Sequence, residues 1–301
     1  MKSQGTGLPG SDLGELFAAA HCDGGIHVLD LAHGAQVGLS DEAVFSSASV
    51  FKVQVALAFF QLVAEGKLDD ATTMTVNPQL QTVGPTGISI FRDPVTLSLH
   101  DLAVQMLTVS DNSATDILIS VIGFGPIQAV AEHLGLSQTA IETDCQGLLQ
   151  SLAKATGRRH WQELVSSEHD PSPDQVLGAL AEAGPIRTSP RDCTKLLSAI
   201  WSPAPGPAEA AREVRRLMAQ QLTRNRIAAG FPRSTKVAAK SGTLIGVVRN
   251  EIGVVEYEDG SRYAAAVFTK AWEPYAYEQE INASIGKAVR TAIEWLRAGQ
   301  A

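Results

Sequence analysis

The sequence predicts an α/β (α+β) protein in which helices flank an antiparallel five-stranded sheet that carries an inserted all-α lobe. Strand patterns occur near both ends of the chain, and a long helical stretch separates them. The turn dipeptide Asp259-Gly260 between two strand patterns favours antiparallel pairing. The 301 residues, 45% of them hydrophobic, suffice for one domain, 1–301. We expect an α/β lobe of residues 1–42 plus 190–301, an all-α lobe of residues 43–189, and a cleft between them.

The first half of the chain is expected to hold two strands and then mostly helices. Helical spacing of apolar residues covers 12–21, 50–63, 99–107, 113–122 and 127–133, and alternation covers the strands 26–31 and 36–39. The 50–63 stretch is almost wholly apolar, which suits a helix that protein surrounds on all sides.

The second half is expected to return to strands after an irregular stretch. Residues 142–185 contain the breakers Gly157, Asp170-Pro171-Ser172-Pro173 and Gly184-Pro185. Helices are then expected at 190–201, 208–222 and about 278–296, and strands at 236–244, 247–257 and 262–269.

Three short motifs carry the functional information. They are Ser49-Val50-Phe51-Lys52, Ser110-Asp111-Asn112 and Lys240-Ser241-Gly242, in that order. Together they form the signature of serine enzymes that acylate themselves on a β-lactam or peptide carbonyl. The S-x-x-K pattern recurs at Ser151 and Ser284, so by itself it proves nothing, whereas the other two motifs occur once each.

Ser49 and Lys52 are predicted to be a nucleophile and its base. Ser49 lies at the start of the apolar helix, where free N–H groups and the helix dipole favour negative charge. Lys52 follows one turn later on the same face. Apolar neighbours favour its neutral amine, which can take the proton of the serine hydroxyl.

Ser110 and Asn112 are predicted to complete the proton path and to hold the substrate. The Ser110 hydroxyl can relay a proton to a leaving amine, and Asn112 can bond a substrate amide. Because Ser, Asp and Asn are also preferred N-cap residues, Ser110 or Asp111 is equally expected to cap the helix that follows.

Lys240, Ser241 and Thr243 are predicted to bind the substrate at the end of a strand. Lys240 would supply a cation for a carboxylate, and the two hydroxyls would add donors. The backbone N–H groups of Ser49 and Thr243 would form the oxyanion hole.

With these motifs the chain resembles class A serine β-lactamases, within the wider family of penicillin-recognising serine hydrolases. The resemblance extends over nearly the whole chain and includes Arg226-Ile227, Val237 to Thr243 and Arg249 to Val255. It implies that Ser49 is acylated, that β-lactam hydrolysis is the leading activity, and that Arg226 or Arg249 could help bind a carboxylate. The alternatives are an intracellular esterase, amidase or peptidase of the same fold, and a penicillin-binding protein that acylates without turnover.

The chain departs from the resemblance in the loop that serves deacylation. Class A enzymes carry a glutamate there, in a pattern like E-x-x-L-N that this chain lacks. An ungapped reading places Cys145 at the glutamate position, with Glu142 and Asp144 close by, and a second reading uses Glu163. These three carboxylates are the candidates for activating the deacylating water.

The composition of the chain limits the kinds of partner and cofactor that we expect it to bind. The net charge of −8 and the absence of a basic run give no footprint for nucleic acid or an anionic membrane. The three cysteines and seven histidines show no metal-ligand spacing, so neither a metal nor another cofactor is expected beside a small-molecule substrate. Because residues 1–7 lack an apolar stretch, the chain is expected in the cytoplasm, or exported with its leader removed. The sequence does not indicate an oligomeric state.

Overall fold

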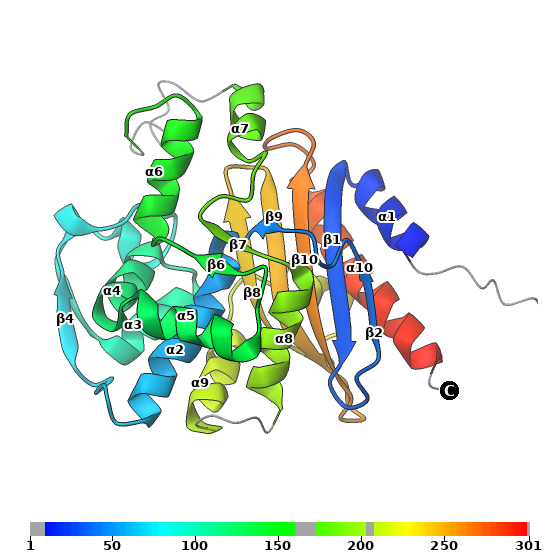
Figure 1. Ribbon diagram of the computed structural model, residues 1–301, viewed down its shortest axis with the longest axis horizontal. Helices are drawn as coiled ribbons and strands as arrows, with labels where there is room; N and C mark the ends of the chain where they lie inside the picture. The colour runs from blue at the N-terminus through cyan, green and yellow to red at the C-terminus, as the bar shows by residue number, and fades with distance from the viewer. Residues whose placement is uncertain (1–9, 161–171, 203–207, 300–301) are drawn as a thin grey trace, which may run out of the picture.

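The centre of the protein is a five-stranded antiparallel sheet with strand order β2-β1-β10-β9-β8. The computed structural model describes residues 10–160, 172–202 and 208–299. The strands are β1 (Cys22–Asp30), β2 (Gln36–Leu39), β8 (Lys236–Leu244), β9 (Val248–Glu256) and β10 (Arg262–Ala271). Strands from both ends of the chain therefore share one sheet, which confirms the predicted fold class (Figure 1).

Helices cover both faces of this sheet. α1 (Gly10–Ala19) and α10 (Glu278–Ala298) pack on one face, and α8 (Pro190–Trp201) packs on the other (Figure 1). Side chains of β10 alternate between the two layers, because successive residues of a strand point to opposite faces. Ala265 and Val267 join the core beneath α10, whereas Ala266 and Phe268 join the core beneath α8.

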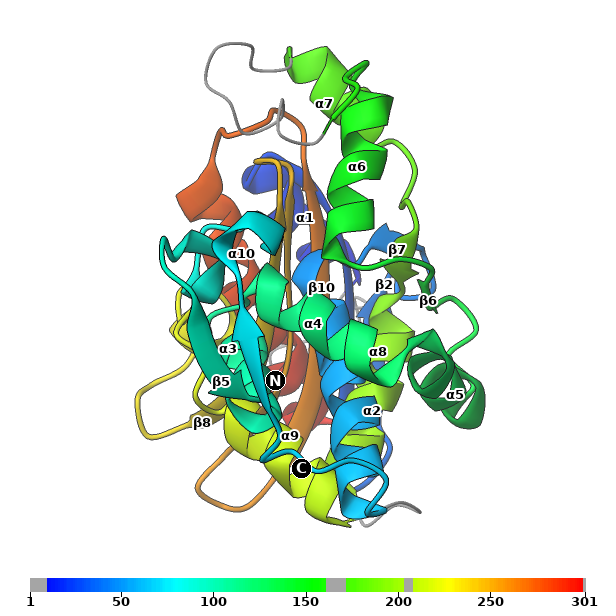
Figure 2. The same cartoon turned by 90° about the vertical axis from the view of Figure 1, so that its left-hand side faces the viewer.

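The remaining helices lie toward the β8 side of the sheet (Figure 1), the side that faces the viewer in Figure 2. They are α2 (Lys52–Ala64), α3 (Leu99–Thr108), α4 (Asn112–Ile122), α5 (Phe124–Leu134), α6 (Cys145–Ala155), α7 (Pro173–Ala179) and α9 (Ala208–Met218). Residues 52–60 of α2 are all buried, as its apolar sequence predicts. Among the described residues no single helix is long and apolar enough to cross a bilayer, and α4 and α5 reach that length only together, across an 88° bend.

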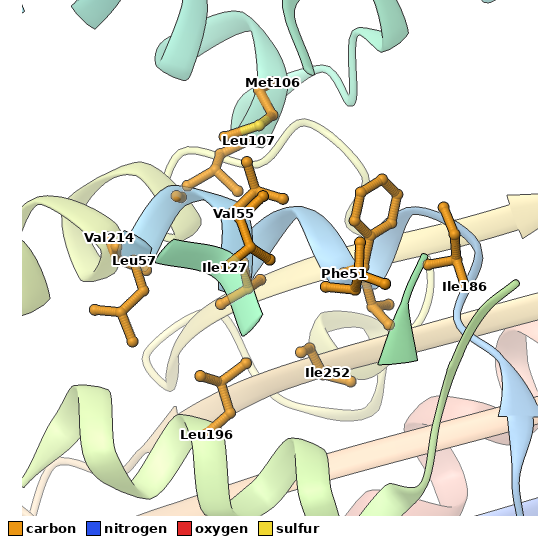
Figure 3. Packing of buried hydrophobic residues seen from close by; sticks show 14 of the residues in the cluster. Phe51, Val55, Leu57, Met106, Leu107, Ile127, Ile186, Leu196, Val214 and Ile252 are labelled. Carbon is orange, nitrogen blue, oxygen red and sulfur yellow. The ribbon is translucent and has the colours of Figure 1, made fainter. Parts of the chain in front are cut away.

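α2 is the centre of the larger hydrophobic core. Side chains from α3, α5, α8, α9 and β9 surround it (Figure 3). Figure 3 labels Val55 and Leu57 of α2 together with Met106, Leu107, Ile127, Leu196, Val214 and Ile252. This packing fixes the helix that begins at Lys52, the predicted base, directly after the 3₁₀ turn that carries the predicted nucleophile Ser49.

Short elements and two helices differ from the expected layout. Residues 142–185 contain α6 and α7 rather than only irregular chain, since the breakers lie at the ends of these helices and not within them. Two small sheets were too short to predict from alternation. They are β3 (Phe45–Ser46) with β7 (Ile186–Thr188) and β6 (Ala140–Ile141), and the hairpin of β4 (Thr73–Val76) and β5 (Val95–Ser98).

Candidate active site

Ser49 lies in a tight turn between strand β3 and helix α2. It belongs to the 3₁₀ helix η1 (Ala48–Phe51), which leads directly into α2. Ala48 has a φ of +44°, a conformation that non-glycine residues rarely adopt and that clusters at functional sites. The side chain of Ser49 is partly exposed, whereas Ala48 and Val50 on either side are buried. Ser49 is therefore partly accessible to solvent between two buried neighbours.

Lys52 is fully buried and its amine is bonded to the Ser110 segment. Its Nζ donates to the Ser110 carbonyl at 2.7 Å and to Asn112 Oδ1 at 2.8 Å, and lies 3.4 Å from Ser110 Oγ. Burial lowers the pKa of Lys52. A neutral amine has two N–H donors, which the two short bonds use, so its lone pair remains for a hydroxyl proton.

Ser110 connects two lysines. Its Oγ accepts a hydrogen bond from Lys240 Nζ at 2.9 Å and lies 3.4 Å from Lys52 Nζ. Its backbone φ is +64°, and the next residue, Asp111, caps α4 with its carboxylate by accepting from Ala114 N at 3.1 Å. Asp111 therefore caps the helix, as expected, while the Ser110 hydroxyl faces the two lysines and its role as a proton relay stays a prediction.

Lys240 is fully buried on β8, and its Nζ donates to the Ser241 carbonyl at 2.7 Å as well as to Ser110. Burial, followed by the charge of Lys52, lowers the pKa of Lys240 well below its usual range. The structure therefore places the Lys240 amine within hydrogen-bond distance of the Ser110 hydroxyl. Its predicted contact with a substrate carboxylate stays a prediction.

β8 approaches η1 so closely that a side chain at position 242 would be tight against the backbone of η1. A Cβ on Gly242 would lie 3.0 Å from both the Ser47 carbonyl oxygen and the Ser49 nitrogen. The Ser49 amide is therefore next to the strand residue that precedes Thr243. The oxyanion hole made from the Ser49 and Thr243 N–H groups stays a prediction, which this proximity supports.

Arg226 is not a surface cation but a buried support for β8 and β9. It is 3% exposed and donates to the Gly242 carbonyl at 2.8 Å, the Asn250 carbonyl at 2.6 Å and Thr243 Oγ1 at 2.6 Å. Because the exposed Thr243 hydroxyl accepts from Arg226, its own proton is directed to another acceptor. Arg249 is also buried and pairs with Glu278.

Asn250 is a site residue that the motifs did not reveal. It is fully buried in β9, and its Nδ2 donates to the carbonyls of Ser46 at 2.9 Å and Ser47 at 3.2 Å. These bonds fasten the segment that precedes Ser49 to the central sheet. The available signal was a run of three polar residues, 249–251, inside an otherwise apolar strand.

The two candidate deacylation carboxylates that the structure describes have partners other than Lys52. Glu142 accepts a hydrogen bond from Arg187 Nη2 at 2.7 Å, and its side chain is 55% exposed. Asp144 caps α6, where it accepts from Gly147 N at 2.8 Å. Glu163 lies outside the described residues.

Cys145 of α6 and Asp116 of α4, rather than these two described carboxylates, lie within electrostatic range of Lys52. Cys145 begins α6, is 4% exposed, and lies within electrostatic range of Lys52. Asp116 Oδ1 accepts from Cys145 N at 2.8 Å, and Oδ2 accepts from Thr82 Oγ1 at 2.7 Å and Gln146 N at 3.0 Å. Burial raises the pKa of the Cys145 thiol far above its usual range, so the thiol keeps its proton. The group of α6 within electrostatic range of Lys52 is therefore a neutral thiol, whose backbone N–H is bonded to Asp116.

The serines of the two other S-x-x-K patterns lie within helices, and the cysteines are buried. Ser151 donates to Leu148 O within α6, and Ser284 donates to Ile281 O within α10. The three cysteines are buried and free of disulfides. Among the residues that the structure describes, no three His, Cys, Asp or Glu side chains gather as a metal site would need.

Fold and site together define a class A serine β-lactamase-like protein. The model of the beta-lactamase enzyme family matches residues 9–295, and the chain belongs to this family. Its resemblance to class A β-lactamases, expected from the three motifs, is thereby confirmed.

Relatives of this chain carry names that imply different functions. The beta-lactamase regulatory protein BlaB of Streptomyces cacaoi is 29% identical over 309 residues, covering 95% of this chain and 97% of its own. The β-lactamase of Sphaerobacter thermophilus shares the fold with a TM-score of 0.75, at 19% identity over 96% of this chain and 98% of that one. A point mutant of PBP-A, solved as an acyl-enzyme complex with penicillin G, has a TM-score of 0.72 and 23% identity, covering 95% of this chain and 96% of that one.

Proposed function

We propose that this protein forms an acyl-enzyme on Ser49 with β-lactams and hydrolyses that intermediate slowly. The observation that carries the proposal is the bonded chain from Lys52 through Ser110 to Lys240, beside a serine on a strained turn. Membership of the beta-lactamase enzyme family supports the substrate class.

Acylation follows from the groups present. The Ser49 oxygen attacks the lactam carbonyl carbon as its proton passes to neutral Lys52, which forms the C–O bond of a tetrahedral intermediate. The N–H groups of Ser49 and Thr243 stabilise the oxyanion. The C–N bond then breaks, and the proton on Lys52 reaches the lactam nitrogen by way of the Ser110 hydroxyl. The Thr243 hydroxyl, oriented by Arg226, is placed to donate to the substrate carboxylate.

Slow deacylation follows from the thiol beside Lys52. Hydrolysis of the ester needs a water molecule and a base to take its proton. A buried thiol with a raised pKa is a poor proton acceptor, and the two described carboxylates predicted for this role are engaged elsewhere. Among the groups that the structure describes, Lys52 is then the base proposed for both half-reactions.

A second candidate function follows from the same feature. A long-lived acyl-enzyme suits a protein that reports β-lactam exposure rather than destroying the compound, and the relative in Streptomyces cacaoi carries a regulatory name. The fate of the adduct distinguishes the two candidates, because a slow hydrolase returns to the unmodified mass and releases hydrolysed product, whereas a reporter keeps the adduct.

Intact-protein mass spectrometry after a pulse of penicillin G tests both candidates. We expect one adduct per chain, its loss in Ser49→Ala, and its persistence for minutes or longer. Ser151→Ala serves as the matched control and should acylate normally. An adduct that survives in Ser49→Ala would contradict the mechanism. Absence of any adduct with wild-type protein would favour the esterase or amidase alternative.

A further inference from the structure

A basic groove lies on the outer side of β8, away from Ser49. It encloses about 530 Å³ between the end of α9, the segment that follows it, and strands β8 and β9. Four cationic side chains and one carboxylate are among its lining residues, namely Arg215, Arg224, Arg233, Lys236 and Glu256. The lining of this groove is therefore positively charged, although the whole protein has a net charge of −8.

The charges of the groove are only partly compensated. Lys236 pairs with Glu256 at 2.9 Å. Arg224 donates to the Val237 carbonyl at 2.8 Å, and Arg215 donates to the Ile200 carbonyl. A backbone carbonyl satisfies one of the five N–H donors of a guanidinium and removes none of its charge. Arg233 is exposed at the rim.

The chemistry of this lining selects a particular class of ligand. Guanidinium groups bind the oxygens of phosphate through paired, charge-assisted hydrogen bonds. Val237, Ala238 and Val254 provide an apolar wall. The volume falls in the range of sites for small organic molecules. A phosphate group beside the arginines, with its organic portion against the β-strands, fits both features.

The segment that forms one wall of the groove is bonded to two catalytic segments. Gln221, which lines the groove, accepts a hydrogen bond from Ser241 N, next to Lys240. Leu222 N donates to Thr108 O at 3.1 Å, two residues before Ser110. A movement of this wall therefore displaces Ser241 and Thr108, and through them the hydrogen-bonded pair Lys240 and Ser110.

We propose that the basic groove binds a phosphate-bearing small molecule and that its occupancy changes the rate of acylation at Ser49. The second half of this proposal rests on the proposed function, whereas the first half does not. The groove acts as a regulatory site because its wall and the catalytic motifs share hydrogen bonds along β8 and α3.

Calorimetric titration with inorganic pyrophosphate, at constant ionic strength, tests the binding. Wild-type protein and Ser49→Ala should bind equally. Arg224→Gln and Arg233→Gln should each weaken the affinity about tenfold, the effect of one charge-assisted hydrogen bond. Arg290→Gln, which removes a cation from α10, is the matched control and should bind as wild type does. Equal affinity in all variants would overturn the site.

The rate of adduct formation with penicillin G, with and without pyrophosphate, tests the regulation. A change of about threefold or more in wild type, absent in Arg233→Gln, is expected. Binding that leaves this rate unchanged would overturn the regulatory half. Failure to form any adduct would sink the proposed acylation, while calorimetry with Ser49→Ala would still decide the binding half.

Discussion

At the scale of single residues, the charge of Asp116 is expected to set the pH at which Lys52 acts. Burial lowers the pKa of Lys52, and the negative charges of Asp116 and Asp111 raise it part of the way back. Lys240, from β8, is the opposing cation, and the thiol of Cys145 completes the surroundings from α6. Asp116→Asn removes one raising charge, so the pKa of Lys52 falls further and its neutral form persists at lower pH.

The acid limb of the acylation rate, plotted against pH, should therefore move to lower pH in Asp116→Asn. Asp144→Asn is the matched control, because Asp144 also holds the start of α6 but is not among the charges acting on Lys52. A limb that moves equally in both variants would mean that Asp116 acts only by holding α6.

A carboxylate at position 145 is expected to shorten the life of the acyl-enzyme. Cys145→Glu places a base beside Lys52, where general base catalysis contributes about 100-fold or more. Cys145→Gln has nearly the same volume without the charge and should keep the long-lived adduct. Mass spectrometry over time after a penicillin pulse measures both. Equal lifetimes in the two variants, both folded by circular dichroism, would contradict a missing base as the cause.

At the scale of elements, the contact between β8 and η1 is expected to control acylation more than stability. A Cβ in Gly242→Ala meets the Ser47 oxygen and Ser49 nitrogen at 3.0 Å, so the strand and turn must separate by a few tenths of an ångström. Loss of one oxyanion-hole donor costs about 100-fold in rate, and we expect a decrease of that order. Gly125→Ala in α5, whose Cβ would meet nothing within 4 Å, should acylate normally. Stopped-flow acylation rates measure both.

The same elements show how far the sequence could predict the site. Ser49, Lys52 and Ser110 were recognised because local motifs carry them, and α8, β2 and β8 were predicted with their observed bounds. The roles of Asn250 and Asp116 could not be predicted, since each depends on which segments meet in space: β9 with Ser46 and Ser47, and α4 with α6. The burial of Lys240 likewise arises only when β8 packs against the Ser110 segment.

At the scale of the whole molecule, protonation of His27 is expected to make the stability of the packed sheet and α8 depend on pH. It lies in β1, is 2% exposed, and its ring nitrogens lie 2.5 Å from Thr194 Oγ1 of α8 and 3.1 Å from Gln36 Oε1 of β2. Burial, followed by the charge of Arg191, lowers the pKa of His27 to about 4 from 6.5. The unfolded chain therefore binds a proton that the folded protein excludes between these two values.

Stability should consequently fall as the pH drops from about 6.5 to about 4, because protons then favour the unfolded state. A pKa difference of 6.5 − 4 = 2.5, at 1.36 kcal/mol per unit, gives a loss of about 3 kcal/mol. Urea unfolding at pH 7 and pH 4 measures it. His27→Gln should lose about 3 kcal/mol less than wild type over this interval, although it starts less stable. His133→Gln, which replaces an exposed histidine, should follow wild type, and a wild-type slope in His27→Gln would show that His27 does not link the sheet and α8 to pH.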